Sequence, residues 1–513
     1  MKLLTPIQMN EVDKYATTRY GLPSLLLMEH AAKQIFDYIN ENYNNQSITI
    51  ICGPGNNGGD GLALARLLVS FTKSKVKVWM LASEDKLTAD GKIYYEICKN
   101  LKVDMNVVSA SNKQHVIAYL KNEKVIVDAI FGTGIKRSIE GTYKEIIEAI
   151  NDSTAAVISV DIPSGIDGVT GKVMGTCVDA DITITFMAPK VGLFLYPGNT
   201  FTGEVKVVNI GIPYTLIEEV PSQIFSIEKE EMSKLLPIRP MRSNKGTYGK
   251  VLAIGGSLGM SGAISLTSLA AYRVGCGTVT AVVPWSIIEI MQVKLTEVMS
   301  LPMAENDGFF DIAAKGQLQE VIKKYNIVAI GPGMGRTNAT LEMLKVVLAS
   351  DKPCVIDADA LYFIPLVLDL LKQRKAPTLL TPHPGEMARM TGKSIEEILE
   401  NPVSYAQKFA KDFGVILLLK IEKTVIADWS GNIYINRCGN QGMAKGGSGD
   451  ALTGIVAGLL AQHMAPIDAA KLGVYLQTRA ADLAKEELSQ YSYLASDTIM
   501  FLSRVFNELE PCK

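Results

Sequence analysis

The sequence lacks the patterns that mark a metal-binding or disulfide-stabilised fold. Its seven cysteines are scattered along 513 residues without a CxxC pair, and its four histidines show no metal-ligand spacing. Paired cysteines and spaced histidines are the usual signs of a structural zinc site or of a disulfide framework. We therefore expect no zinc site, and we expect free thiols in a reducing, cytoplasmic setting.

Charge of one sign and long apolar runs are also absent. The formal net charge is −2, and no uninterrupted apolar stretch is long enough to cross a bilayer. The first residues reach the polar side chains of Gln8 and Asn10 too soon for a secretory signal. These features predict a cytoplasmic protein that binds neither nucleic acid nor membrane.

What the chain does have is ordinary globular composition, with 48% hydrophobic and 20% charged residues. Its length predicts at least two domains, and the absence of an internal repeat indicates that the two halves differ. The strand pattern is lost from Tyr214 to Glu231. We therefore expect domains at 1–215 and 229–510, joined by a linker at 216–228.

Both halves show short apolar strands that alternate with helical stretches, after an opening helical region at 8–42. This alternation predicts two α/β domains, each a parallel sheet covered by helices in three αβα layers. The expected strands of the first half are 48–51, 76–81, 125–127, 156–160, 182–186 and 205–210. Those of the second half are 250–254, 278–283, 327–330, 354–356, 378–380 and 415–419.

The densest group of glycines runs from Gly439 to Gly454 and contains a single acid, Asp450. The residues from Ala451 to Gln462 read as a helix, so the loop ends at a helix N-terminus. Glycines let a ligand approach the backbone N–H groups, and the helix dipole favours an anion such as a phosphate. Asp450 can act as a base there. The alternative is a glycine-rich turn in which Asp450 is only an N-cap. The four glycines packed around positions 446 to 449 are more than a helix cap requires, so we favour the anion site.

Three other loops follow strands of the second half, where ligands bind in parallel α/β sheets. The first, Gly331–Gly335, allows close approach of a ligand, and the second carries Asp357 and Asp359, which suit capping or a cation held through water. The third places His383 between two prolines and ends in Glu386, a candidate helix cap. A lone histidine is more often structural, but the prolines and the strand-end position favour a functional one.

The first half has its own set of strand-end loops. A glycine-rich stretch from Cys52 to Gly61 precedes an expected helix from Leu62, which is a phosphate-binding arrangement without a GxGxxG or Walker motif. Asn57, Asp128 and Ser164 offer hard oxygens from three strand ends, which suit a cation. The alternative role for the acids Asp60, Asp128 and Asp161 is to cap helices and loops. Three polar, glycine-flanked loops at one edge of the sheet favour a binding site over this alternative.

The second half resembles the ADP/ATP-dependent NAD(P)H-hydrate dehydratases of the ribokinase-like superfamily. The motifs GPGMG, DADAL, TPHPGE and GNQGMAKGGSGD occur in the family's order across roughly 225–510. The resemblance implies Asp450 as catalytic base and places the hydrated nicotinamide against Ala263, Gly335, His383 and Asp450. It places the adenine nucleotide, with Mg²⁺, against Lys420, Ile421, Glu422, Lys423, Thr424, Gly447, Ser448 and Gly449. Two positions depart from the family: Ile421 replaces a usual glycine, and Lys445 replaces a small or hydroxyl residue.

The first half resembles the Rossmann-like NAD(P)H-hydrate epimerase domain over roughly 1–215. The resemblance implies a K⁺ ion held by Asn57, Asp128 and Ser164, and Asp161 as the catalytic acid or base. It implies substrate contacts at Asn56, Asn57, Gly58, Gly59, Asp60, Gly132, Thr133, Gly134, Ile135, Lys136, Arg137, Ser138 and Asp161.

Together these resemblances predict a bifunctional repair enzyme that epimerises the hydrates NADHX and NADPHX and dehydrates the S form with ADP or ATP. ADP is the expected nucleotide, and the small-residue helices favour a homo-oligomer. One alternative is a ribokinase-like kinase with a regulatory N-terminal nucleotide-binding module. Another is an N-terminal interaction scaffold, in which case Asp161→Ala would leave turnover of the R hydrate unchanged.

Overall fold

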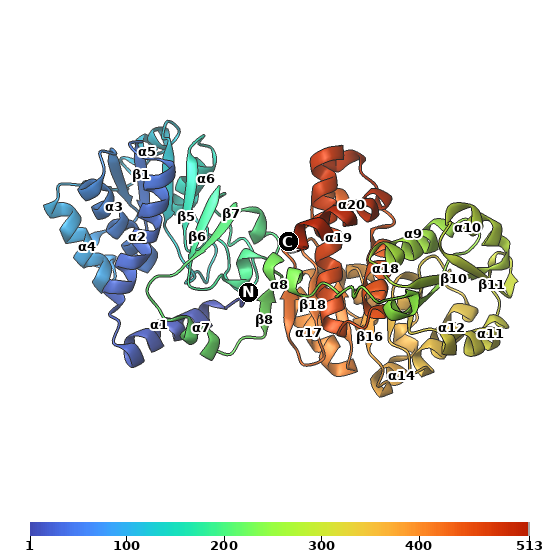
Figure 1. Ribbon diagram of the computed structural model, residues 1–513. Coiled ribbons are helices and arrows are strands. Elements are labelled where there is room, and N and C mark those ends of the chain that lie inside the picture. The colour runs from blue at the N-terminus through green and yellow to red at the C-terminus, as the bar shows by residue number, and fades with distance from the viewer. Residues whose placement is uncertain (511–513) are drawn as a thin grey trace. The chain divides into compact units, whose positions relative to one another are not determined.

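The computed structural model describes residues 1–510, which form two compact units (Figure 1). One unit comprises Lys2–Ile224, and the other begins at Phe225 and includes Met1. The boundary falls inside the segment expected as a linker, but that segment is not irregular: it contains the end of a helix and a three-residue strand. Six cysteines in the described part are free thiols, and Cys512 lies outside the described residues.

The first unit is built on a seven-stranded sheet in the order β3-β2-β1-β4-β5-β6-β7, and every neighbouring pair is parallel. The strands are β1 Ile48–Cys52, β2 Val76–Met80, β3 Asp104–Val107, β4 Val125–Ala129, β5 Ala156–Val160, β6 Ile182–Phe186 and β7 Glu204–Val208. The helices are α1 Pro6–Tyr20, α2 Ser24–Asn42, α3 Asn56–Phe71, α4 Ala89–Asn100, α5 Lys113–Leu120, α6 Gly141–Asn151 and α7 Tyr214–Glu219. The strand β3 was not expected from the sequence.

Apolar residues on both faces of this sheet explain its three layers. Side chains alternate along a strand, so Ile50 packs in one core with residues of α1 to α4, whereas Ile51 packs in another with residues of α5 and α6. Two separate apolar cores on one sheet require helices on both sides. The expected three-layer αβα, Rossmann-like arrangement is therefore present.

Two helix boundaries differ from those expected in the first unit. The helical region 8–42 is divided into α1 and α2, because Gly21 ends α1 in the left-handed conformation (φ 67°) and Pro23 follows. The stretch Asn56–Gly61, expected as a loop, instead forms the first turns of α3. A Cβ at Gly58 would lie 1.9 Å from the carbonyl oxygen of Gly53, so close packing explains glycine in this helix.

The second unit contains a ten-stranded sheet in the order β11-β10-β9-β14-β15-β16-β17-β18-β19-β8. Its strands are β8 Ile224–Ser226, β9 Lys250–Ile254, β10 Thr278–Pro284, β11 Met299–Met303, β14 Ile327–Ile330, β15 Cys354–Ile356, β16 Thr378–Leu380, β17 Ile416–Leu419, β18 Val425–Ala427 and β19 Ile433–Ile435. The pairs from β11 to β17 are parallel, whereas β17, β18 and β19 pair antiparallel. A separate hairpin pairs β12 Glu305–Asn306 with β13 Phe309–Phe310.

Helices cover both faces of this second sheet, with α9, α18, α19 and α20 on one side and α11, α12, α14 and α17 on the other (Figure 1). The helices are α8 Lys229–Lys234, α9 Ser261–Arg273, α10 Ile288–Lys294, α11 Ala314–Val321, α12 Asn338–Ala349, α13 Ala358–Leu361, α14 Leu368–Gln373, α15 Pro384–Thr391, α16 Ile395–Glu400, α17 Pro402–Phe413, α18 Ser448–Ala461, α19 Pro466–Ser492 and α20 Ala495–Leu509. No helix within residues 1–510 is long and apolar enough to span a membrane.

Each sheet reverses its strand order at one point, and ligands bind at such points in open α/β sheets. In the first unit the reversal lies between β1 and β4, and in the second between β9 and β14. The glycine-rich stretch up to Gly61 follows β1 and the loop Gly331–Gly335 follows β14, whereas the loop that begins at Gly439 follows β19. The fold therefore gives each unit one edge at which the candidate residues can meet.

Candidate active sites

The first unit has a cavity of about 940 Å³ at the edge where β1 and β4 end. Most of the residues expected to contact substrate line it, namely Asn56, Asn57, Asp60, Gly132, Thr133, Gly134, Ile135, Lys136, Arg137, Ser138 and Asp161. Gly58 and Gly59 are not among the lining residues, because both are buried within the first turns of α3. The helix α1 also contributes to the wall through Asn10 and Asp13, which the sequence did not point to.

Asp161 follows β5 and is held in a strained, well-defined position. Its φ of 67° is in the left-handed region, which is costly for a residue other than glycine. Its Oδ1 accepts hydrogen bonds from the backbone N–H of Phe186 at 3.1 Å and from Thr185 Oγ1 at 3.2 Å, and it forms an ion pair with Lys190. Lys190 is 1% exposed, so this cation is committed to the Asp161 carboxylate and to Thr185.

A second carboxyl group, Asp60, lies on α3 in the wall of the same cavity. It is 9% exposed, and burial, followed by the charges of Asp161 and Asp13, raises its pKa well above the ordinary value. A carboxyl group in this environment is held protonated and can donate a proton. The cavity wall therefore combines a charge-paired acid, Asp161, with a neutral one, Asp60.

Two of the three expected K⁺ ligands contact each other directly. Ser164 donates through its Oγ to Asp128 Oδ1 at 2.5 Å and through its backbone N–H to Oδ2 at 2.8 Å. Ser164 Oγ also accepts from the backbone N–H of Phe131 at 2.8 Å, next to Gly132, beside which Asn57 lies. Asn57 is buried, and its Nδ2 has no hydrogen-bond partner. The oxygens that converge here fit a monovalent cation in chemical type.

In the second unit, the glycine loop leads directly into α18. Gly447 is the N-cap with φ 95°, and Asp450 lies in the first turn of α18, so the helix begins at Ser448, three residues before the expected start at Ala451. Burial, followed by the charge of Asp357, raises the pKa of Asp450 to about 6. Asp450 is therefore ionised near neutral pH but has a higher proton affinity than an exposed aspartate, which suits a general base.

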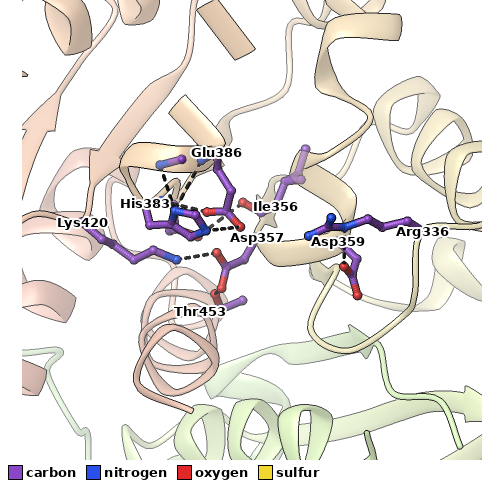
Figure 2. A network of polar contacts seen from close by, with 10 residues as sticks. Arg336, Ile356, Asp357, Asp359, His383, Glu386, Lys420 and Thr453 are labelled. Carbon is purple, nitrogen blue, oxygen red and sulfur yellow. Dashed lines mark hydrogen bonds and ion pairs between the residues drawn. The ribbon is translucent and has the colours of Figure 1, made fainter. Parts of the chain in front are cut away.

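A buried ion pair lies beside this helix start (Figure 2). Lys420 Nζ is 2.7 Å from Asp357 Oδ1, and Thr453 Oγ1 donates to Asp357 Oδ2 at 2.8 Å. A Cβ at Gly449 would lie 3.1 Å from Lys420 Nζ, so this ammonium group adjoins the loop backbone. Burial opposes ionisation of Asp357, but Lys420 and the hydrogen bonds from Thr381 and Thr453 together outweigh it and lower the pKa of this carboxyl group.

His383 and Glu386 cap the helix α15 reciprocally (Figure 2). The backbone N–H of Gly385 donates to His383 Nδ1 at 3.0 Å, and the backbone N–H of His383 donates to Glu386 Oε2 at 2.8 Å. Burial and the charge of Lys420 lower the pKa of His383, so its ring is neutral, and its Nε2 lies 3.6 Å from Glu386 Oε1. Burial raises the pKa of Glu386 to about 7. His383 thus caps the helix while its exposed ring edge remains able to bind a ligand.

Ala263 and Gly335 are connected to the same centre by hydrogen bonds. Thr267 Oγ1 donates to the carbonyl oxygen of Ala263 at 3.1 Å and to that of Asp450 at 3.0 Å, which ties α9 to α18. The backbone N–H of Gly335 donates to Asp359 Oδ2 at 2.9 Å. These bonds place both expected substrate contacts on elements fixed to the glycine-loop region.

The expected nucleotide segment forms the turn between β17 and β18, from Lys420 to Thr424. Lys423 Nζ donates to the carbonyl oxygens of Arg437 at 2.7 Å and Gly439 at 3.2 Å, so it supports the start of the glycine loop. Ile421, where the sequence resemblance implied a glycine, keeps a tight turn in which its backbone N–H donates to the carbonyl oxygen of Leu419 at 3.1 Å. The side chain of Lys423 is therefore occupied structurally, whereas that of Lys420 adjoins the anion loop.

A magnesium ion would rely mainly on its nucleotide here. Within residues 1–510, no three histidine, cysteine or acidic side chains converge as a metal cluster. Mg²⁺ commonly keeps several waters and binds through substrate phosphates and one or two carboxylates. The acids around Lys420 fit that second role.

Sequence reasoning missed three residues that hold these centres: Lys190, Lys420 as the partner of Asp357, and Thr453. Lys190 offered a signal, because it is a single charge inside the apolar run from Met187 to Leu193. Thr453 offered none, because a threonine one turn after Asp450 is indistinguishable from any helical threonine. The pairing of residues 63 positions apart depends on the fold.

Comparison with known proteins shows the same two parts. A family model described as NAD(P)H-hydrate dehydratase matches residues 251–503, and one described as YjeF-related protein N-terminus matches residues 24–192. A bifunctional NAD(P)H-hydrate repair enzyme of Moorella thermoacetica is 39% identical over 99% of this chain and 97% of its own. That of Escherichia coli is 33% identical over 96% of this chain and 92% of its own.

A solved structure also matches the second unit. The ADP/ATP-dependent NAD(P)H-hydrate dehydratase of Bacillus subtilis, co-crystallised with ATP and Mg²⁺, is 33% identical and has a TM-score of 0.51. The match covers 56% of this chain and all of that one. Sequence identity along nearly the whole chain, with both family models in order, identifies its family. The chain belongs to the bifunctional NAD(P)H-hydrate repair enzymes.

Proposed function

We propose that the unit Lys2–Ile224 interconverts the R and S hydrates of NADH and NADPH, and that the second unit dehydrates the S form with ADP or ATP. The observation that carries the dehydratase assignment is Asp450 in the first turn of α18, buried beside the Asp357–Lys420 pair. The whole-length relatives bear the name of this double activity.

In the dehydratase reaction, Asp450 accepts the proton of the substrate hydroxyl as that oxygen attacks the terminal phosphoryl group of the nucleotide. The backbone N–H groups of Gly447 to Gly449 and the ammonium group of Lys420 face the charge that develops on the phosphoryl oxygens. The phosphorylated hydroxyl then leaves as phosphate, and loss of a ring proton restores the dihydronicotinamide. His383, neutral and with an exposed ring edge, can orient the nicotinamide by hydrogen bonding.

In the epimerase reaction, the carbon that inverts carries a hydroxyl group next to a ring nitrogen. Inversion requires that a proton be delivered to one position and removed from another during loss and return of the hydroxyl. Asp161, which forms an ion pair with Lys190, is the proposed acceptor. The N-terminal cavity lined by residues 132–138 and by Asn56 and Asn57 would hold the remainder of the dinucleotide.

The ions and the assembly complete this proposal. Asn57, Asp128 and Ser164 would hold K⁺, whose positive charge would balance the buried Asp128 and attract the substrate's phosphates. Mg²⁺ would enter the second unit with its nucleotide, as the ATP/Mg²⁺ co-crystal of the Bacillus subtilis protein supports. We also propose a cytoplasmic homo-oligomer, on the basis of the unpaired cysteines and the small-residue helices.

A single assay tests both activities. A mixed R/S preparation of NADHX is incubated with ADP, Mg²⁺ and K⁺, and recovery of the dihydronicotinamide absorbance is followed. The wild type should recover the full amount, Asp450→Ala none, and Asp161→Ala only the S fraction at the normal rate. No recovery by the wild type with either ADP or ATP would contradict the proposal and favour a kinase acting on another alcohol.

A further inference from the structure

Two arginines lie over one tyrosine ring near the candidate dehydratase site. The guanidinium carbon of Arg336 is 4.9 Å from the centroid of the Tyr362 ring, and that of Arg389 is 4.3 Å from it. Arg336 directly follows Gly335, and Arg389 lies on α15, the helix that His383 caps. Both arginines are exposed and the tyrosine is half-buried. The three side chains therefore form an open, cationic platform.

The lack of a polar partner within residues 1–510 distinguishes Arg389 from other arginines that lie over a tyrosine ring. Arg19 lies over a tyrosine ring and forms an ion pair with Glu219 at 2.9 Å. Arg239 also lies over a tyrosine ring and donates to the carbonyl oxygen of Gly275 at 2.7 Å. Arg389 makes no hydrogen bond or ion pair with any residue of the described chain. Its five N–H donors are thus oriented by stacking and remain available to an outside anion.

The platform adjoins the residues proposed to contact substrate. Asp359 accepts from the backbone N–H of Gly335 at 2.9 Å and from Arg336 Nε at 3.3 Å, so one carboxylate joins the substrate loop to the platform (Figure 2). The pKa of His383 is lowered by burial first, then by the charge of Lys420, and in smaller part by Arg336. Arg336 is therefore close enough to act on the His383 ring electrostatically.

We propose that Arg336, Tyr362 and Arg389 form a phosphate subsite that binds the pyrophosphate of the hydrated dinucleotide, on the premise that the second unit is the proposed dehydratase. The planar guanidinium fork matches phosphate oxygens in a bidentate manner, and stacking on an aromatic ring reduces the freedom that binding would remove. Asp359 neutralises part of the charge of Arg336, whereas Arg389 keeps its full charge for the ligand. The nicotinamide would lie between this subsite and Asp450.

The alternative phosphate sources are the nucleotide and the 2′-phosphate of NADPHX. The phosphates of ADP have a proposed site of their own at Gly447 to Gly449 and Lys420. The phosphoryl group that is transferred must lie there, because there it can meet the substrate hydroxyl. The pyrophosphate is present in both NADHX and NADPHX, whereas the 2′-phosphate is present only in NADPHX. The identity of the phosphate can therefore be read from the substrate dependence of one variant.

The test uses steady-state kinetics of the full chain with S-NADHX or S-NADPHX and saturating ADP and Mg²⁺. Arg389→Gln should raise KM about tenfold for both substrates, the effect of removing one charge-assisted contact, and leave kcat and the KM for ADP within about twofold. Arg389→Lys should recover part of the loss, because a lysine supplies charge without the fork. The matched control is Arg239→Gln, which removes an arginine stacked on a different tyrosine, Tyr248. This variant should leave the KM values for S-NADHX and S-NADPHX unchanged.

Three results would overturn the inference: an unchanged KM for both substrates, a rise confined to S-NADPHX, or a rise in the KM for ADP. The second would assign the platform to the 2′-phosphate, and the third would assign it to the nucleotide. A wild type without dehydratase activity would instead remove the proposed function itself. Thermal unfolding of Arg389→Gln at the wild-type temperature would show that the changes do not come from loss of fold, as is expected for an exposed side chain.

Discussion

Both units contain a buried aspartate–lysine pair at the carboxyl edge of a sheet, but the pair has a different relation to the proposed catalytic acid. In the first unit, Lys190 pairs with Asp161 itself. In the second unit, Lys420 pairs with Asp357, and Asp450 lies next to that pair, with no ion-pair partner of its own within residues 1–510. The first arrangement gives the catalytic group a cationic partner of its own, whereas in the second arrangement burial raises the pKa of the catalytic group.

The difference corresponds to the two proposed reactions. A base that removes a hydroxyl proton during phosphoryl transfer works best with a pKa near the working pH, and Asp450 has one of about 6. In the first cavity, two carboxyl groups of the wall have a raised pKa: burial raises that of Asp60 well above its ordinary value and that of Asp13 to about 6. Several carboxyl groups thus share the first cavity, whereas Asp450 is the proposed base of the second unit.

Removing each catalytic carboxylate gives the largest expected effect and shows whether the two sites are independent. Asp450→Asn should lower the rate of S-NADHX dehydration by about 10³-fold or more, because the hydroxyl proton loses its acceptor. Epimerisation, measured by chromatographic exchange between the R and S hydrates without nucleotide, should be unchanged. Asp161→Asn should produce the reverse pattern, and loss of both activities in either variant would contradict two separate centres.

Breaking the direct pair should have the next largest effect. Lys190→Met leaves Asp161 as a buried carboxylate without its cation, which costs about 3–5 kcal/mol when a buried pair loses one partner. We expect the midpoint of chemical denaturation of the first unit to fall and epimerase activity to drop about 100-fold. Lys190→Arg, which keeps the charge, should recover part of both. Normal epimerase activity in a folded Lys190→Met protein would show that Asp161 does not need this cation.

The indirect pair makes a different prediction, which concerns pH. The pKa of Asp450 is raised by burial first and by Asp357, and lowered by Lys420. Since the base form is active, dehydratase kcat/KM should be full above pH 6 and fall as the pH decreases through about 6. Lys420→Met removes the charge that lowers this pKa, so the acid limb should move to higher pH. If the acid limb of the pH profile stays at the wild-type position in Lys420→Met, the charge of Lys420 does not influence the pKa of Asp450.

Some features of the two sites could be predicted from the sequence, whereas others became visible only in the folded structure. The glycine patterns predicted the strand-end loops and the helix start at Asp450, because a backbone that must turn or approach a ligand requires glycine locally. The partners of Asp161 and Asp357 lie 29 and 63 residues away, and no local pattern marks them. The glycines at the start of α3 led to the wrong prediction of a loop. Their low helix propensity is overridden by close packing against Gly53, which no local sequence pattern shows.

The glycine stretches of the two units also differ in the contacts that fix their conformation. A substitution that tests this difference has the smallest expected effect on activity. The glycines of α3 are held by the packing of a helix, whereas the loop before α18 is held by side chains. Lys445 donates to the carbonyl oxygens of Tyr491 at 2.9 Å and Tyr493 at 2.6 Å, and Tyr493 donates through its hydroxyl to Asn440 at 2.9 Å.

Lys445 therefore links the glycine loop to the C-terminal end of α19 and to Tyr493, which follows it, at a position where the sequence resemblance implied a small or hydroxyl residue. Lys445→Ser should free the loop and raise the KM for ADP about threefold to tenfold, with a smaller change in kcat, since the loop would have to be ordered by the nucleotide instead. Lys445→Arg should retain most of the affinity because it can still reach the carbonyl oxygens. The KM for ADP in steady-state assays measures the effect, and an unchanged value for Lys445→Ser would show that the loop is ordered by Asn440 and the backbone of α18 alone.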